Sequence, residues 1–228
     1  MTNDIKPIKI WGRGGPNPPK VAIVLVELDL PHETILQPLS KVKEPEYLAI
    51  NPNGRVPAIY DPNNDLTLWE SGAIIEYLIE KYDTSNRISF PAGSNEAQLV
   101  RQWLYYQASG QGPYFGQASW FKKFHPERVA SALERYVNEI NRVTGVLEGW
   151  LEKQKVEHPG AADGPWLVGG KYTVADLVFA PWYTVLGYVV KGEDGFDIEN
   201  FPVVKDWVGR ISARSAVKQV FANIQPIL

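Results

Sequence analysis

Cysteine is absent from the 228 residues of this chain. Its absence excludes structural disulfides, thiolate metal sites and a protein thiol acting as nucleophile or resolving group. Any sulfur chemistry must therefore come from a ligand. Histidine is nearly as scarce, and its three scattered residues fit no metal-ligand spacing, so we expect no bound metal.

An excess of positive charge is also missing. The formal net charge is -3 and the pI is about 5.7, which gives no electrostatic footprint for nucleic acid. No apolar run is long enough to span a bilayer, and residues 1–6 contain no apolar signal core. We therefore expect a cytoplasmic protein without a nucleic-acid or membrane partner. With 44% apolar and 21% charged residues, the chain has an ordinary globular composition.

Residues 1–86 alternate between segments typical of strands and of helices. A helix between the first two strands implies a parallel pair, and the turn-rich residues 61–65 make a hairpin of the next two. We expect an α/β domain of the thioredoxin-like kind. Its expected strands are 8–11, 34–36, 56–60 and 66–68, and its expected helices are 20–28, 45–49 and one from Ser71, with a Gly/Pro loop at 12–19.

Helical spacing follows a linker at residues 87–94, which predicts an all-α domain over residues 95–228. Within it, Thr173 to Asp176 matches a capping box, which we interpret as structural. The expected helices are 98–109, 127–155, 173–190 and 203–220, with breaks at 110–113, 158–160 and 200–202.

Two short motifs carry the chemistry of the first domain. Ser71 is placed to cap a helix whose start attracts a carboxylate, and Glu70 beside it can hold an ammonium. A γ-glutamyl group carries both charges. Alternatively, Ser71 only caps the helix and Glu70 only complements its dipole. The nearby Val56-Pro57 pair favours a ligand, because a cis bond there would let the backbone of Val56 pair with a peptide. Together the motifs point to glutathione, although the sequence leaves the isomer open.

The chain resembles the glutathione transferases, and more narrowly the nu class together with the branch of a yeast nitrogen-regulating prion protein. The likeness extends over nearly the whole chain. It is carried by Pro16-Asn17 with Lys20 to Leu25, by Asn51 to Ala58, by Trp69 to Ile74, by Trp103 to Gly110, by Gly116 to Ala118, and by Trp166 to Gly169 with Thr173 to Leu177.

This resemblance implies a role for Asn17 near the glutathione sulfur, where it can donate a hydrogen bond but cannot act as a base. Read from the loop alone, Asn17 is a turn residue. Amides at the start of the helix expected at Lys20 would also favour a thiolate. The remaining implied binding residues are Val56 at the cysteinyl backbone, Glu70 and Ser71 at the γ-glutamyl group, and Lys41 or Lys43 at the glycyl carboxylate. Arg55 and Pro57 beside Val56 are also expected to bind glutathione.

The implied activity is that of a dimeric glutathione transferase in detoxification, with glutathione as cosubstrate. Its thiol would attack an electrophile or reduce a disulfide or peroxide. Acceptor-site candidates are Tyr114, Phe115 and Trp120, although aromatic residues beside a helix break are often core or interface residues. The alternative is a glutathione-binding regulatory or scaffold protein with little turnover.

Overall fold

The computed structural model describes residues 5–223. Residues 1–4, on which the expectation about a signal segment partly rests, and residues 224–228 of the predicted helical domain lie outside that range. The chain forms two compact units: unit 1 runs to Ile88 and resumes at Ser215, and unit 2 is Ser89–Arg214. Within residues 5–223, no helix has the length and apolar character needed to cross a membrane.

Unit 1 contains a four-stranded sheet in the order β2-β1-β3-β4. β1 and β2 are parallel, with Ile10 opposite Thr34, whereas β1 pairs with β3 and β3 with β4 in antiparallel fashion. This topology confirms the thioredoxin-like prediction. The strands are β1 (Ile8–Trp11), β2 (His32–Ile35), β3 (Ala58–Asp61) and β4 (Leu66–Trp69).

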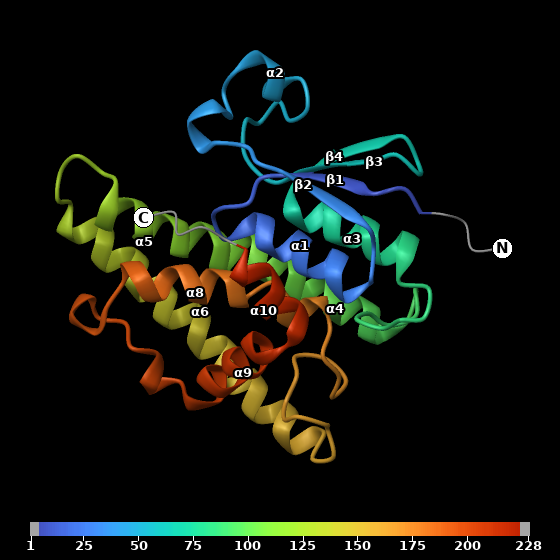
Figure 1. Cartoon of the computed structure of the whole chain (residues 1–228). Helices are drawn as coiled ribbons and strands as arrows, with labels where there is room; N and C mark the ends of the chain where they lie inside the picture. Colours follow the sequence, from blue (N-terminus) through green and yellow to red (C-terminus); the bar gives the residue numbers. More distant parts are fainter. Residues whose placement is uncertain (1–4, 224–228) are drawn as a thin grey trace. The chain divides into compact units, whose positions relative to one another are not determined.

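Helices α1 and α3 cover one face of this sheet, and α2 stands apart from that layer (Figure 1). The alternation of β1 buries Ile8 and Ile10, and the helical spacing of α3 buries Ile74 and Leu78, so both apolar faces meet in one core. The helices are α1 (Asn17–Glu27), α2 (Pro45–Leu48) and α3 (Ser71–Tyr82), with a 3-10 turn, η1, at Leu39–Lys41.

The start of α1 differs from the prediction. The helix begins at Asn17, inside the segment expected to be a loop, and Pro18 and Pro19 occupy its first turn. Proline is tolerated there, because the first N–H groups of a helix have no acceptor within the helix in any case. The prolines therefore indicate where the helix begins, and they do not exclude a helix here.

Unit 1 is completed by α10 (Ser215–Ala222), which packs along α1 (Figure 1). Ala216 and Val217 are buried in this packing. The sequence placed this segment in the helical domain, because helical spacing shows which face is apolar but not which partner covers it. The predicted boundary of that domain therefore differs from the compact units.

Unit 2 is helical, and its helices enclose a core that includes Phe115, Phe179 and Trp207. The capping box predicted at Thr173 and Asp176 is confirmed. The helices are α4 (Asn95–Tyr106), α5 (Gly112–Lys123), α6 (Ala130–Glu157), α7 (Val174–Leu177), α8 (Ala180–Val189) and α9 (Pro202–Ala213), with 3-10 turns at Gly192–Asp194 and Ile198–Asn200.

The break predicted at residues 110–113 is wrong. A π-helical segment, Gln107–Gln111, joins α4 to α5 directly. Gln107 Nε2 donates to Gln111 Oε1 at 3.0 Å, and Gln111 Nε2 donates to the carbonyl of Phe179 at 3.2 Å, so buried hydrogen bonds support the wider turn. Pro113 lies in the first turn of α5, where proline is accepted.

Candidate functional site

Glu70 and Ser71 stand where β4 turns into α3. The structure corrects the predicted cap by one residue: Glu70 holds the N-cap position with a φ of 72°, and Ser71 is the first helical residue. The carbonyl of Glu70 accepts the N–H of Ile74 at 3.0 Å, which leaves the three preceding N–H groups without an acceptor in the helix. A Cβ placed on Gly72 would meet nothing within 4 Å, so this helix start faces open space.

The positive φ of Glu70 is a strained conformation for a residue with a side chain. Strained backbone conformations of this kind are common at ligand-binding and catalytic positions, where the surrounding structure maintains them. The strain therefore marks Glu70 as a candidate functional residue independently of its charge.

The segment before β3 is held by side chains from α2 and the turn after it. Tyr47 Oη donates to the carbonyl of Arg55 at 2.8 Å, and Asn51 Nδ2 donates to the same carbonyl at 2.6 Å. The side chain of Arg55 is exposed. The Val56–Pro57 peptide bond is cis, which settles the isomer that the sequence left open.

Gly12 brings the start of α1 next to Val56. It has a φ of 102°, and a Cβ on it would lie 2.7 Å from Val56 Cβ and 3.2 Å from Pro18 Cγ. No side chain fits at this position. The lack of a side chain at Gly12 thus lets the backbone after β1 approach both the Val56–Pro57 segment and the first turn of α1.

The two lysine candidates for the glycyl carboxylate differ in their contacts with the rest of the candidate site. Lys43 Nζ donates to the carbonyl of Asn53 at 2.8 Å, and Asn53 Nδ2 donates to Glu70 Oε1 at 3.3 Å. A short chain of polar contacts therefore joins Lys43 to Glu70. Lys41 is exposed in η1, and among the described residues no hydrogen bond or ion pair draws it into this set.

Asn17 is half-buried at the first position of α1, and Lys20, one turn further on, is only 2% exposed. Burial lowers the pKa of Lys20 to about 7, although the negative charge of Glu70 acts in the opposite direction. Sequence reasoning assigned no role to Lys20. A lysine within an otherwise apolar helical run was the signal that could have drawn attention to it.

The three acceptor-site candidates all belong to α5 in unit 2. Phe115 is completely buried and packs edge-on against Tyr183 with 5.4 Å between ring centroids, so it is a core residue. Tyr114 is half-buried, with the Arg142 guanidinium 5.9 Å from its ring. Trp120 is 49% exposed and stacks on Phe124. Only Tyr114 and Trp120 therefore remain available for contact with a ligand.

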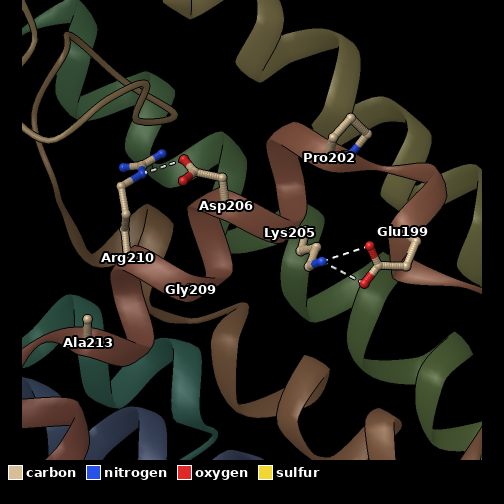
Figure 2. Close-up of a pocket in the computed structure, with 7 residues that line it drawn as sticks. All are labelled: Glu199, Pro202, Lys205, Asp206, Gly209, Arg210 and Ala213. Atoms are coloured by element: carbon tan, nitrogen blue, oxygen red, sulfur yellow. Dashed lines mark hydrogen bonds and ion pairs between the residues drawn. The ribbon is translucent and has the colours of Figure 1, made fainter.

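A pocket of about 510 Å³ lies on α9, and none of the predicted site residues lines it (Figure 2). Its charged groups already neutralise one another: Arg210 Nε meets Asp206 Oδ2 at 2.8 Å, and Lys205 Nζ meets Glu199 Oε1 at 2.6 Å. The set around Glu70 in unit 1 is therefore the stronger candidate. Among residues 5–223, no His, Asp or Glu side chains are grouped as a metal ion requires.

Comparison with known proteins identifies the family of this chain. Residues 13–86 match the model of the glutathione S-transferase N-terminal domain, and residues 112–215 match that of the glutathione S-transferase C-terminal domain. The chain is 65% identical to the glutathione S-transferase-like protein tpcF of Aspergillus fumigatus, over 98% of each chain. This chain belongs to the glutathione S-transferase family.

Two further relatives define the branch. The glutathione transferase URE2P6 of Phanerochaete chrysosporium, solved in complex with oxidized glutathione, is 46% identical, covers 97% of each chain and superposes with a TM-score of 0.85. The transcriptional regulator URE2 of Saccharomyces cerevisiae is 38% identical over 90% of this chain and 64% of its own length. The resemblance to the yeast branch is thereby confirmed.

Proposed function

We propose that this protein is an enzyme that binds glutathione in unit 1 and uses its thiol as the nucleophile. The observation that carries the proposal is the meeting of Val56 and the first turn of α1 across Gly12, together with the polar chain from Lys43 to Glu70. Support comes from the related glutathione transferase that was solved with oxidized glutathione.

Each proposed binding residue corresponds to one chemical group of glutathione. The Glu70 carboxylate faces the γ-glutamyl ammonium, and Ser71 with the open N–H groups of α3 faces the γ-glutamyl carboxylate. The Val56 backbone, flanked by Arg55 and Pro57, pairs with the cysteinyl unit as an added strand would. Lys43, which already reaches Asn53, is the better placed of the two lysines for the glycyl carboxylate.

The chain supplies no thiol of its own, so the reacting sulfur belongs to glutathione. Asn17 donates a hydrogen bond to that sulfur and stabilises its thiolate. The thiolate either forms a thioether with an electrophile, from which a leaving group departs, or attacks a disulfide. In the second case the S–S bond of that disulfide breaks, a mixed disulfide forms, and the other sulfur leaves as a thiolate. Tyr114 and Trp120 are the acceptor-site candidates. We further propose a cytoplasmic homodimer that acts in detoxification.

Calorimetric titration with reduced glutathione tests the binding site. Glu70→Gln and Ser71→Ala should each weaken binding about tenfold or more, because a hydrogen bond to a charged group contributes about 1.5 to 3 kcal/mol. Glu80→Gln, on an exposed part of the same helix, is the matched control and should leave the dissociation constant unchanged. Equal affinities in all folded variants would refute the site.

The second candidate function is that of a glutathione-binding regulator with little turnover, favoured by the 38% identity to a transcriptional regulator. Parallel assays of aryl-halide conjugation, disulfide reduction and peroxide reduction separate the two functions. Turnover that depends on Asn17 supports the enzyme. Tight binding without turnover in any of the three assays supports the regulator.

A further inference from the structure

Asn53 lies in the turn between α2 and β3, and the backbone of this turn is held by other residues. The N–H of Asn53 donates to Oδ1 of the buried Asn51 at 3.0 Å, and its carbonyl accepts a hydrogen bond from Lys43 Nζ at 2.8 Å. The N–H of the next residue, Gly54, donates to the carbonyl of Asn51 at 2.9 Å. The position of Asn53 is therefore fixed by contacts that do not involve its own side chain.

Gly54 permits the approach of Lys43 to this turn. It has a φ of 60°, and a Cβ on it would lie 2.7 Å from the carbonyl oxygen of Val42 and 2.7 Å from Lys43 Cδ. Because glycine has no Cβ, the side chain of Lys43 can lie across the turn and reach the carbonyl of Asn53. The ammonium of Lys43 thus contacts the backbone of Asn53, and the amide of Asn53 is left for another partner.

That partner is Glu70. Asn53 Nδ2 donates to Glu70 Oε1 at 3.3 Å, and within the described part of the chain the Asn53 side chain makes no other hydrogen bond. An asparagine in a turn usually bonds to a backbone group close in sequence, and Asn51 already does so in this turn. The ordinary role of a turn asparagine therefore does not account for the amide of Asn53.

The contact suits a carboxylate that recognises a cation. Glu70 is exposed, so its side chain would exchange between rotamers without a partner to hold it. A carboxylate has about four acceptor positions on its two oxygens, and the amide of Asn53 uses one of them at Oε1. Because the amide is uncharged, it orients the carboxylate without adding a cation that would compete with the ammonium of a ligand.

We propose that Asn53 is a positioning residue for γ-glutamyl recognition, which holds the Glu70 carboxylate toward the ammonium of the ligand without neutralising it. This inference rests on the proposed function, in which Glu70 binds that ammonium. Asn53 is assigned no contact with the sulfur, so its effect is the same before and during the reaction of the thiol. The chemical feature that Asn53 helps to select is a free amino group on the γ-glutamyl unit.

Calorimetric titration of Asn53→Ala with reduced glutathione is the first measurement. Affinity should fall about threefold to tenfold, because a typical hydrogen bond has a modest net effect. Asn138→Ala, the same substitution on an exposed part of α6, is the matched control and should bind as wild type does. Wild-type affinity in folded Asn53→Ala would overturn the inference. Asn53→Ser, which also lacks the amide and keeps a residue common in turns, takes its place if Asn53→Ala does not fold.

A second ligand separates positioning of Glu70 from a general disturbance of the site. The ligand is the glutathione analogue in which hydrogen replaces the amino group of the γ-glutamyl unit. Asn53→Ala should change the affinity for this analogue by less than about twofold, because the group that Glu70 recognises is missing. Equal losses for glutathione and for the analogue would mean that Asn53 only supports the turn, and would overturn the inference.

The double variant Asn53→Ala with Glu70→Gln gives an independent check. If Asn53 acts through Glu70, Asn53→Ala should weaken glutathione binding by less than about twofold once Glu70 has been replaced by glutamine. Fully additive losses would contradict this mechanism. In turnover assays Asn53→Ala should raise KM and leave kcat within about twofold of wild type, as expected for a residue that affects binding alone.

Asn53→Lys tests the need for an uncharged donor at this position. Its ammonium should pair with Glu70 and compete with the ammonium of glutathione, so affinity should fall further than in Asn53→Ala. An affinity equal to or higher than that of Asn53→Ala would overturn the requirement for a neutral donor.

The two possible failures can be told apart. If wild-type protein does not bind glutathione, or if Glu70→Gln binds it as tightly as wild type, the proposed site fails and the role of Asn53 fails with it. If Glu70→Gln weakens binding and Asn53→Ala does not, only the role of Asn53 fails.

Discussion

Asn17 combines two features: it opens α1, and its amide can donate to a sulfur but cannot take a proton. A donor of this kind interacts more strongly with a thiolate than with a neutral thiol. Its contribution therefore belongs to the reaction step more than to binding. This separates it from Glu70 and Ser71, which in the proposed site meet parts of glutathione whose charges do not change.

Asn17→Ala should lower turnover about tenfold to a hundredfold, because one donor to a charged sulfur contributes about 1.5 to 3 kcal/mol. The dissociation constant of glutathione should change little. Steady-state kinetics with a thiolate titration of the complex measures both. Asn95→Ala, at the exposed start of α4, is the control. Unaltered turnover and thiol pKa would make Asn17 only a helix-start residue.

Asp61 is a second residue whose environment determines its behaviour. It is fully buried and accepts hydrogen bonds from Tyr77 Oη, Tyr82 Oη and the N–H of Asn63. Burial alone would raise the pKa of Asp61, but these hydrogen bonds outweigh it and lower the pKa to about 2. The carboxylate therefore joins the end of β3 to α3.

Asp61 should make unit 1 sensitive to acid. Its folded pKa lies below the unfolded value of about 3.9, so its stabilising effect is present above that value and is lost as pH falls toward 2. Between about pH 5 and pH 2, wild type should lose about 2 kcal/mol more stability than Asp61→Asn. Denaturant unfolding across this range measures the difference. Asp65→Asn, in the same turn but exposed, should follow wild type.

At the scale of elements, the capping box of α7 supports the core of unit 2. Asp176 Oδ1 accepts the N–H of Leu167 and Nε1 of Trp207, each at 2.9 Å, and Oδ2 accepts the N–H of Thr173 at 2.9 Å. Asp176 and Thr173 are fully buried. One carboxylate thus satisfies donors from a loop, from its own helix start and from α9.

Asp176→Ala should destabilise the protein by about 3 kcal/mol or more, because three buried donors would lose their acceptor at about 1 kcal/mol or more each. Denaturant midpoints with unchanged slopes measure the loss. Glu152→Ala, on an exposed part of α6, should stay within about 0.5 kcal/mol of wild type. A small effect at Asp176 would mean that water replaces the carboxylate.

Local sequence patterns predict which segments form helices and which form strands, but they often do not predict where these helices and strands begin and end. The apolar spacing of residues 74–82 and the period of β1 are local signals, so the sheet and α3 were predictable. In the sequence Pro18 and Pro113 indicate breaks, yet both lie in the first turn of a helix, because proline disrupts a helix only in its interior. The cap at Glu70 was missed by one residue, since a strained φ has no local sequence signature.

The candidate site was predictable only in part for a related reason. Glu70, Ser71 and Val56 stand in short motifs whose chemistry can be read from the sequence. The lowered pKa of Lys20 cannot be found in that way, because it comes from the burial of the side chain in the folded chain. Phe115 shows the opposite error, in which an aromatic residue near a helix start proved to be core.

At the scale of the whole molecule, large aromatic side chains remain at the surface. Tyr105 is 61% exposed, Phe124 56% and Trp120 49%, whereas Trp103 in the same segment is buried. Exposed apolar side chains of this size commonly mark a protein interface. The proposed homodimer would cover part of this surface.

Light scattering should give a mass of twice 25.6 kDa at micromolar concentration. Tyr105→Glu should shift the mass toward that of the single chain, because a charge in an apolar interface loses its water. Glu152→Ala, which leaves the exposed aromatic residues intact, should keep the wild-type mass. A wild-type protein that remains a single chain would refute the dimer.

The packing of α10 on α1 has a consequence for how the chain folds as it is synthesised. Unit 2 is one continuous segment, Ser89–Arg214, whereas unit 1 needs Ser215–Ala222 to cover α1. A ribosome delivers that helix after every residue of unit 2. Unit 1 therefore begins to emerge from the ribosome before unit 2 but is completed after it. Its α1 surface stays uncovered by α10 until residues 215–222 have left the exit tunnel.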